Sequence, residues 1–251
     1  MSRREAPRGR YLGFVRLLGV GKRYGRGPWV LRDLSLDVSG LVVLTGGNGS
    51  GKSTLLRIVA GVTCPTEGRV VDRPASVGYV PERFPSDVRM SVRDYLRHMS
   101  AIRGASGEVL ERLGFRGSMT APMATLSKGN TQKVALAQAF AATDLLVLDE
   151  PFSGLDTAAS VALVEMLAER TAVVADHEGH LPSAQVVSLS GAHVTIEFSR
   201  ASGLGELSDL DGVRSVEPRG TGARVLVEPA HSDTVLAEAL RLGCSVRSVR
   251  S

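Results

Sequence analysis

The stretch "LTGGNGSGKST" (residues 44–54) follows an apolar segment and places four glycines before a lysine and two hydroxyl residues. Residues 46–53 fit the pattern G-x-x-x-x-G-K-[ST] at every defined position. Glycines allow backbone N–H groups to converge on phosphate oxygens without interference from side chains. A helix that begins at Lys52 directs the positive end of its dipole toward the same anion. The stretch therefore predicts a nucleotide-binding loop between a buried strand and a helix.

Within this loop, we expect Lys52 to reach the β- and γ-phosphates and Ser53 to offer its hydroxyl to Mg²⁺. The loop alone supports binding of ATP or GTP and leaves the class of nucleotide hydrolase open. The other residues that we expect to surround the phosphates are Gly46, Gly47, Asn48, Gly49, Ser50, Gly51 and Thr54.

The composition is that of an ordinary globular protein: 251 residues, 43% hydrophobic and 22% charged. This length allows one large domain or a larger and a smaller one. A net charge of +4, spread among acidic residues, gives no reason to expect a nucleic-acid partner. The basic residues at 1–12 are interpreted as a solvated tail. Arg16 interrupts the first apolar stretch, which argues against a secretion signal, and no run approaches the ~18 apolar residues of a membrane span.

Strand-like and helix-like segments alternate as far as about residue 190. The apolar runs at 41–45, 144–150 and 171–176 are typical of buried parallel strands, and 158–170 has helical spacing. We therefore expect an α/β domain over residues 13–190 around a mainly parallel sheet.

Beyond Ser190 the pattern changes to short alternating strands separated by two helical segments. The predicted order β-α-β-β-α-β matches the ferredoxin-like split motif, so we expect a small α+β accessory domain over residues 191–251. It is interpreted either as a dimerisation or stability appendage or as a ligand-sensing regulatory domain. The predicted strands are 193–199, 213–218, 223–229 and 244–250, and the predicted helices are 204–212 and 232–243.

Two adjacent carboxylates end the apolar run "LLVLDEP" (residues 145–151). Asp149 is predicted at the carboxyl end of a buried strand, where open α/β sheets bind ligands. We expect Asp149 to hold Mg²⁺ through water and Glu150 to polarise the water that attacks the γ-phosphate.

A third segment, "TLSKGNTQKVALAQAF" (residues 125–140), precedes that strand. Ser127 is a candidate N-cap residue, and a helix N-terminus with a free hydroxyl and a glycine N–H is a second phosphate-binding surface. One nucleotide does not need two such helix ends from one chain. We therefore expect this surface to contact the nucleotide of another subunit.

Together these motifs resemble the ATP-binding subunit of an ATP-binding-cassette (ABC) transporter, over about residues 13–190. "LSKGN" resembles the family signature LSGGQ, and "SGLD" resembles the loop after the catalytic glutamate, known as the D-loop. The resemblance implies that the signature residues contact ATP bound to the partner subunit. The signature residues are Ser127, Lys128, Gly129 and Asn130, and those of the D-loop are Ser153, Gly154, Leu155 and Asp156.

Three further residues carry the resemblance. His177 resembles the switch histidine at the γ-phosphate, with His180 as the alternative. Tyr24 resembles the aromatic residue that stacks on adenine, although plain packing is the alternative interpretation. Glu82 in "VGYVPE" stands where the family has a glutamine that touches Mg²⁺.

Several positions depart from the family pattern. Lys128 replaces a signature glycine and adds a cation that could approach the γ-phosphate of the partner's ATP. Asn130 replaces the signature glutamine, and Gly47 replaces a proline. The stretch between Glu82 and Leu126 is short for the helical arm of the family.

The resemblance implies an ATPase that uses ATP and Mg²⁺, with Lys52, Glu150 and His177 as its catalytic residues. Two ATPase subunits, identical or different, close on ATP and drive a separate transmembrane permease at the cytoplasmic face of the membrane. The subfamily resemblance favours an exporter. The alternative is a soluble ABC-type ATPase in translation, DNA repair or cluster assembly. A kinase or GTPase of another family is a third option, against which the signature argues.

Overall fold

The computed structural model describes residues 14–85, 88–103, 107–142, 144–189, 194–228 and 231–250. The predicted basic tail and the predicted domain boundary at residue 190 lie outside these residues. The chain divides into two compact units, which we describe separately. Of the described residues, those within 14–20, 33–46 and 52–189 form the large unit, and those within 21–32, 47–51 and 194–250 form the small unit.

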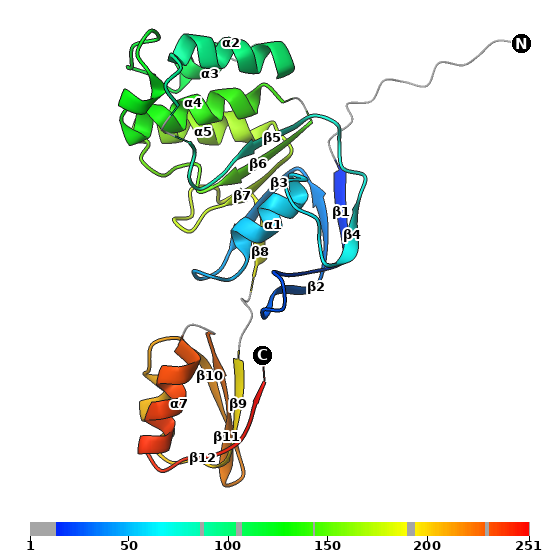
Figure 1. Cartoon of the computed structure of the whole chain (residues 1–251), viewed down its shortest axis with the longest axis vertical. Helices are drawn as coiled ribbons and strands as arrows, with labels where there is room; N and C mark the ends of the chain where they lie inside the picture. Colours follow the sequence, from blue (N-terminus) through cyan, green and yellow to red (C-terminus); the bar gives the residue numbers. More distant parts are fainter. Residues whose placement is uncertain are drawn as a thin grey trace, which may run out of the picture. The chain divides into compact units, whose positions relative to one another are not determined.

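A five-stranded parallel sheet in the order β5-β6-β7-β3-β8 forms the centre of the large unit (Figure 1). Every residue of β6 and β7 is buried, which explains why both read as continuous apolar runs. The predicted strands at 41–45, 144–150 and 171–176 are thereby confirmed. The strands are β3 (Leu41–Thr45), β5 (Val77–Val80), β6 (Leu145–Asp149), β7 (Ala172–Ala175) and β8 (Gln185–Ser188).

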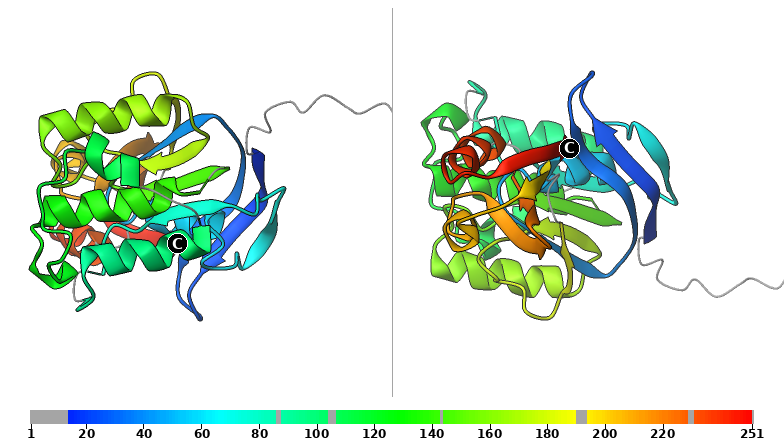
Figure 2. Two further views of the ribbon diagram at one scale, coloured as in Figure 1. Left: turned by 90° about the horizontal axis from the view of Figure 1, so that it is seen from above. Right: turned by 90° about the horizontal axis from the view of Figure 1, so that it is seen from below.

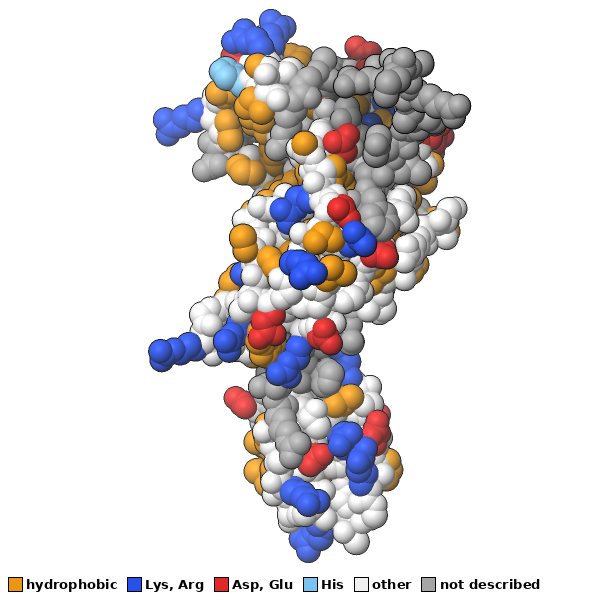
Figure 3. Space-filling view, turned by 90° about the vertical axis from the view of Figure 1, so that its right-hand side faces the viewer, with side chains coloured by type: hydrophobic (Ala, Val, Ile, Leu, Met, Phe, Trp, Pro, Cys, Tyr) orange, Lys and Arg blue, Asp and Glu red, His pale blue; other side chains and the backbone are white. Residues whose placement is uncertain are grey.

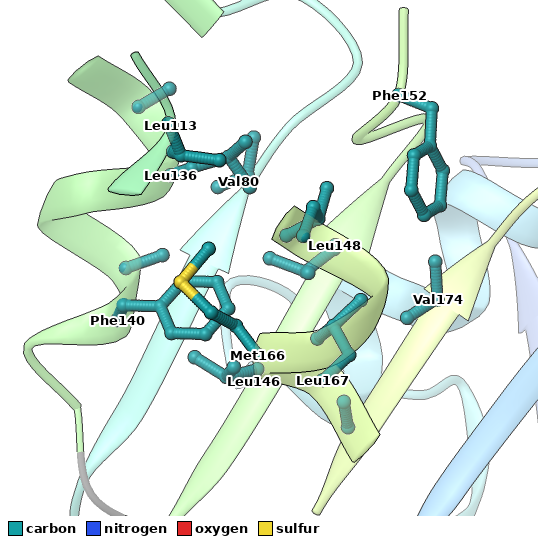
Figure 4. Close-up of a cluster of buried hydrophobic side chains, with 14 of the residues drawn as sticks. Val80, Leu113, Leu136, Phe140, Leu146, Leu148, Phe152, Met166, Leu167 and Val174 are labelled. Carbon is teal, nitrogen blue, oxygen red and sulfur yellow. The ribbon is translucent and has the colours of Figure 1, made fainter. Parts of the chain in front are cut away.

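Helices α1 (Lys52–Val59), α4 (Lys128–Phe140) and α5 (Thr157–Ala168) belong to the same unit. Phe140 of α4 and Met166 of α5 lie beside Leu146 of β6 (Figure 4), and Leu148 belongs to the same buried cluster. Each fully buried side chain of this kind contributes about 1.5–3 kcal/mol to folding. This core holds α4 and α5 against the strand that ends at Asp149.

The helical arm that the family resemblance implies is formed by α2 (Val92–Arg103) and α3 (Gly107–Arg112), packed on α4. Figure 2 shows α4 lying between α5 and α2. A separate buried cluster fills the space between the arm and α4. Its members are Val92, Leu96, Leu110, Met123, Val134 and Ala137.

A second sheet, in the order β2-β1-β4, was not predicted from the sequence. Its strands are β1 (Phe14–Arg23), β2 (Trp29–Ser39) and β4 (Glu67–Val71).

On the face drawn in Figure 3, Lys and Arg side chains are interspersed with Asp and Glu at many places. Among the described residues, no helix has both the length and the apolar character that crossing a bilayer requires.

The C-terminal part of the small unit has the element order β-α-β-β-α-β. Its antiparallel sheet has the order β10-β11-β9-β12, which places β11 between β9 and β10 as in a split βαβ motif. This is the order that the sequence predicts. The elements are β9 (Val194–Arg200), α6 (Leu204–Ser208), β10 (Val213–Arg219), β11 (Gly222–Val227), α7 (Ser232–Arg241) and β12 (Ser245–Arg250).

Candidate nucleotide site

The helix after the phosphate loop begins at Lys52, as predicted. In the large unit, Lys52 Nζ donates a hydrogen bond of 2.6 Å to the carbonyl oxygen of Gly46. This bond keeps the ammonium group beside the beginning of the loop.

The loop residues 47–51 are grouped with the small unit. Gly51 has φ +94°, and a Cβ there would lie 2.7 Å from the Leu31 side chain and 3.0 Å from the Val30 carbonyl oxygen. Glycine is therefore required at this position for both space and backbone conformation. Ser50 is 2% exposed, and within the described part of the chain its buried hydroxyl oxygen has no hydrogen-bond partner.

The carboxyl end of β6 carries a buried carboxylate that fits a metal cation. Asp149 is 2% exposed, and its carboxylate bonds the hydroxyl of Ser53. Burial raises the pKa of Asp149 above its usual range; the bond from Ser53 lowers that pKa, and the nearby charge of Glu82 raises it. The second carboxylate oxygen, Oδ2, is buried and has no hydrogen-bond partner among the residues that the structure describes. An unpaired buried carboxylate oxygen is costly, and a bound cation removes that cost.

The donor set suits Mg²⁺, which binds through hydroxyl and carboxylate oxygens and keeps positions for phosphates and water. Within the described ranges no group of three or more His, Cys, Asp and Glu side chains gathers as a metal cage. Of the three predicted metal ligands, Ser53 bonds the Asp149 carboxylate, and Glu82 lies near enough for its charge to raise the pKa of Asp149. Their role as metal ligands stays a prediction.

Glu150, the next residue, is held close to His177. The distance from His177 Nδ1 to Glu150 Oε2 is 2.7 Å. Burial raises the pKa of the Glu150 carboxyl, while the hydrogen bond and charge of His177 lower it. Glu150 also has φ +50°, a conformation that costs free energy in a non-glycine residue and that is found often at functional sites.

His180, the alternative switch histidine, contacts Asp176 and Phe152 instead of Glu150. Its backbone N–H donates to Asp176 Oδ2 at 2.7 Å, and its Nδ1 lies 3.1 Å from Asp176 Oδ1. Its ring stacks on Phe152 with 4.1 Å between ring centroids. The His177 side chain is 63% exposed and reaches Glu150, so the geometry favours His177 for a role at the nucleotide.

The sequence prediction missed Asp176, which is 2% exposed at the end of β7. Its carboxylate accepts the backbone N–H groups of Glu178 and His180 and thereby fixes the turn that carries His177. The position of a carboxylate directly after the apolar run 171–175 was the available signal.

The signature segment begins as predicted. Ser127 is the N-cap of α4, and its Oγ accepts the N–H of Asn130 at 3.3 Å. The structure adds a contact within the same chain that the sequence did not predict: Lys128 Nζ donates to Ser153 Oγ at 2.8 Å. Gly129 lies so close to the D-loop that a Cβ there would be 2.5 Å from the Gly154 carbonyl oxygen.

Asp156, the last residue of the D-loop, has two partners. Its Oδ1 accepts the N–H of Ala159 at 2.9 Å and caps α5, and its Oδ2 accepts a bond of 2.8 Å from Lys133 Nζ. The bond from Lys133 is the main reason why the pKa of Asp156 is lowered. The Lys133 side chain is only 6% exposed and also donates to the Gly114 carbonyl oxygen at 3.2 Å. Sequence reasoning did not single out Lys133.

Comparison with known proteins identifies the family to which this chain belongs. The family described as "ABC transporter" matches residues 31–153. The cytochrome c biogenesis ATP-binding export protein CcmA of Cupriavidus pinatubonensis is 33% identical over 194 residues, which cover 68% of this chain and 86% of that protein. This chain belongs to the ABC transporter ATP-binding family.

Other relatives of this ABC ATPase match over less of their length. The zinc import ATP-binding protein ZnuC of Magnetococcus marinus is 41% identical over 140 residues, which cover 54% of each chain. The chain thus spans about half the length of this relative. The names include both import and export proteins, so the exporter assignment stays a prediction.

Solved structures support the ABC cassette fold. The dimeric structure of the ATP-binding cassette MJ0796 bound to ADP and Pi has a TM-score of 0.60 and 22% identity. The match covers 70% of this chain and 94% of MJ0796. The predicted ABC-type ATPase fold is therefore confirmed.

Tyr24 lies in the small unit of this ABC ATPase and is 50% exposed. The ammonium of Lys22 lies 5.1 Å from the centroid of its ring. An exposure of this size argues against Tyr24 as a core residue. Its contact with adenine stays a prediction.

Proposed function

We propose that this chain is the ATP-hydrolysing subunit of an ABC transporter that energises a separate transmembrane permease. The observation that carries the proposal is the pairing of Glu150 with His177 directly beside Asp149. A carboxyl group with a raised pKa, held by an imidazole near a metal-binding carboxylate, suits the activation of water for attack on a phosphate.

In this proposal each residue has a stated task. Lys52 and the backbone of residues 46–51 bind the phosphates, and Ser53 and Asp149 hold Mg²⁺, with Glu82 nearby. When bound, Mg²⁺ would neutralise the negative charge that develops on the phosphate oxygens. Glu150 orients water and accepts its proton, and His177 holds the Glu150 carboxylate and faces the γ-phosphate.

Ser127 and Gly129 are proposed to contact ATP bound to a second ATPase subunit, which is either identical or a sister chain. Closure of the two subunits on ATP drives the permease, and hydrolysis opens them again. The chain would then lie at the cytoplasmic face of the membrane through its permease. The dimer of the MJ0796 cassette supports this arrangement at the level of the fold.

Export is our proposed direction of transport. It rests on the resemblance of "GYVPE" and "LSKGN" to exporter ATPases and is supported by a relative described as an export protein that is matched over 86% of its length. A regulatory role for residues 191–251 is proposed on the domain order alone. Transport into or out of membrane vesicles that contain the reconstituted complex would decide the direction.

Two measurements test the proposal. The purified chain should hydrolyse ATP in a Mg²⁺-dependent manner, and Lys52→Ala should abolish this activity. The chain should also copurify from detergent-solubilised membranes with an integral membrane protein. Mg²⁺-dependent ATPase activity in a chain that remains entirely in the soluble fraction of its native cells would favour the soluble ABC ATPase.

A further inference from the structure

The first turns of α4 are tied to the loop after β6 by three side-chain hydrogen bonds. Lys128 bonds Ser153 at 2.8 Å, Gln132 Nε2 donates to the Pro151 carbonyl oxygen at 3.0 Å, and Lys133 bonds Asp156 at 2.8 Å. Residues 128 and 132 are one helical turn apart and therefore lie on the same face of α4.

Gln132 and Lys133 are buried, whereas the bond from Lys128 is exposed. The aliphatic part of Lys128 also packs on Gly154, where a Cβ would lie 3.2 Å from Lys128 Cγ and 3.3 Å from Cδ. Gly154 has φ +79°, a conformation that favours glycine. Lys128 thus covers the D-loop with its stem and bonds it with its ammonium group.

The contacts continue from the D-loop to the catalytic carboxylate. The backbone N–H of Ser153 donates to the Glu150 carbonyl oxygen at 3.2 Å, and Leu155 N–H donates to Phe152 O at 3.0 Å. Ser153 therefore belongs to the same turn as Glu150, whose side chain bonds His177.

We propose that Lys128 is a positioning residue that acts within its own subunit: its bond to Ser153 makes the signature turn and the loop that begins at Glu150 move as one body. The inference rests on the proposed ATPase function and goes beyond it. A glycine at this position, as in the family signature, has no side chain for such a bond. The surface that faces the partner's ATP is thereby connected to the catalytic glutamate of the neighbouring site.

The sequence-based expectation was that the Lys128 ammonium approaches the γ-phosphate of the partner's ATP. The two roles make different predictions. A bond to Ser153 affects the geometry of Glu150, and hence the rate of hydrolysis, more than the binding of ATP. A contact with the partner's phosphate affects ATP affinity and dimer formation and does not depend on Ser153.

The test compares Lys128→Met, Ser153→Ala and the double variant, with Lys128→Arg as the conservative change. Methionine keeps much of the stem and removes the charge and the donor. We expect each single variant to lower kcat about three- to tenfold and to change KM for ATP by less than about twofold. The double variant should be no slower than the slower single variant, because both remove the same bond. Lys128→Arg should retain most of the rate.

Arg97→Met is a matched control, since Arg97 is an exposed cation on α2 that pairs with Asp94 at 2.8 Å, i,i+3, away from the D-loop. It should have wild-type kcat. The proposal would be overturned if the reductions in kcat caused by Lys128→Met and Ser153→Ala multiply in the double variant. So would a rise in KM for Lys128→Met that Ser153→Ala does not share.

A second measurement does not require ATPase activity. Hydrogen exchange of the Ser153 and Leu155 amides in the nucleotide-free chain should become about three- to tenfold faster in Lys128→Met and stay unchanged in Arg97→Met. Unchanged exchange in Lys128→Met overturns the inference even if the chain is an ATPase. Faster exchange in a chain without ATPase activity would instead count against the proposed function alone.

Discussion

His177 Nδ1 lies 2.7 Å from Glu150 Oε2, across the ends of two neighbouring parallel strands. The pair is adjacent to Asp149, the buried carboxylate at the end of β6. Two groups from residues 27 positions apart are thus joined at the edge where parallel α/β sheets bind ligands.

The two histidines of the turn after β7 should respond differently to substitution. His177→Ala should lower kcat by about a hundredfold or more, because Glu150 loses its partner at the nucleotide, and should leave thermal stability nearly unchanged. His180→Ala should lower the Tm, because the stacking on Phe152 and the bond to Asp176 are lost. The checks are steady-state ATPase kinetics and thermal unfolding. A greater loss of kcat in His180→Ala than in His177→Ala would reverse our assignment.

The elements that could be predicted from the sequence are those with a local signal. The buried strands β3, β6 and β7 are continuous apolar runs, and the start of α1 follows from the phosphate loop. The N-cap at Ser127 could also be predicted from the residue type and the helical pattern after it.

The contacts between distant segments could not be predicted. The sheet β2-β1-β4 depends in part on the pairing of β1 with β4, which lie far apart in the sequence. The bond from Lys128 to Ser153 joins residues 25 positions apart, and the buried Lys133 finds Asp156 and Gly114 only after α3, α4 and α5 have packed. Residue types and spacing carry no information on such side-chain partners.

The pH dependence should follow the raised pKa of Glu150. Because burial raises this pKa above the usual value of 4.5, the acid limb of kcat/KM should lie above pH 4.5, and activity should fall as the pH drops through it. A group whose pKa is raised by folding stabilises the folded state at low pH and loses that contribution as the pH rises. Glu150→Gln should therefore be more stable than the wild type at pH 7, in the absence of nucleotide, and should lose this advantage near pH 4. Tm measurements at both pH values provide the check.

Stabilisation by Mg²⁺ and ATP should require Asp149. Wild-type protein should show a higher Tm with Mg²⁺ and ATP than with ATP and EDTA, because a ligand that binds only the folded state shifts the unfolding equilibrium. In Asp149→Asn, the difference in Tm between these two conditions should be much smaller. Asp144→Asn is the control, since the Asp144 carboxylate accepts the Ser76 N–H at the opposite end of β6 and should leave the difference intact. An unchanged Mg²⁺ response in Asp149→Asn would exclude Asp149 as a metal residue.

Lys133 should be required for folding stability. Lys133→Met should lower the Tm, because the Gly114 carbonyl oxygen and Asp156 Oδ2 both lose the bond from Lys133. The pKa of Asp156 is lowered in the folded state, so the bond contributes at neutral pH and is lost as the pH falls through that lowered pKa. The difference in Tm between wild type and Lys133→Met should therefore be larger at pH 7 than at pH 3. An equal difference at both pH values would mean that packing of the stem, and not the ion pair, accounts for the effect.

In the proposed function, Glu150 activates water at an ATP site that a second subunit completes. The most direct measurement combines ATPase activity with the molecular mass of Glu150→Gln in Mg²⁺ and ATP. We expect turnover to fall by more than about a hundredfold, ATP to stay bound and the mass to correspond to a dimer. Full ATPase activity in Glu150→Gln would contradict this role of Glu150.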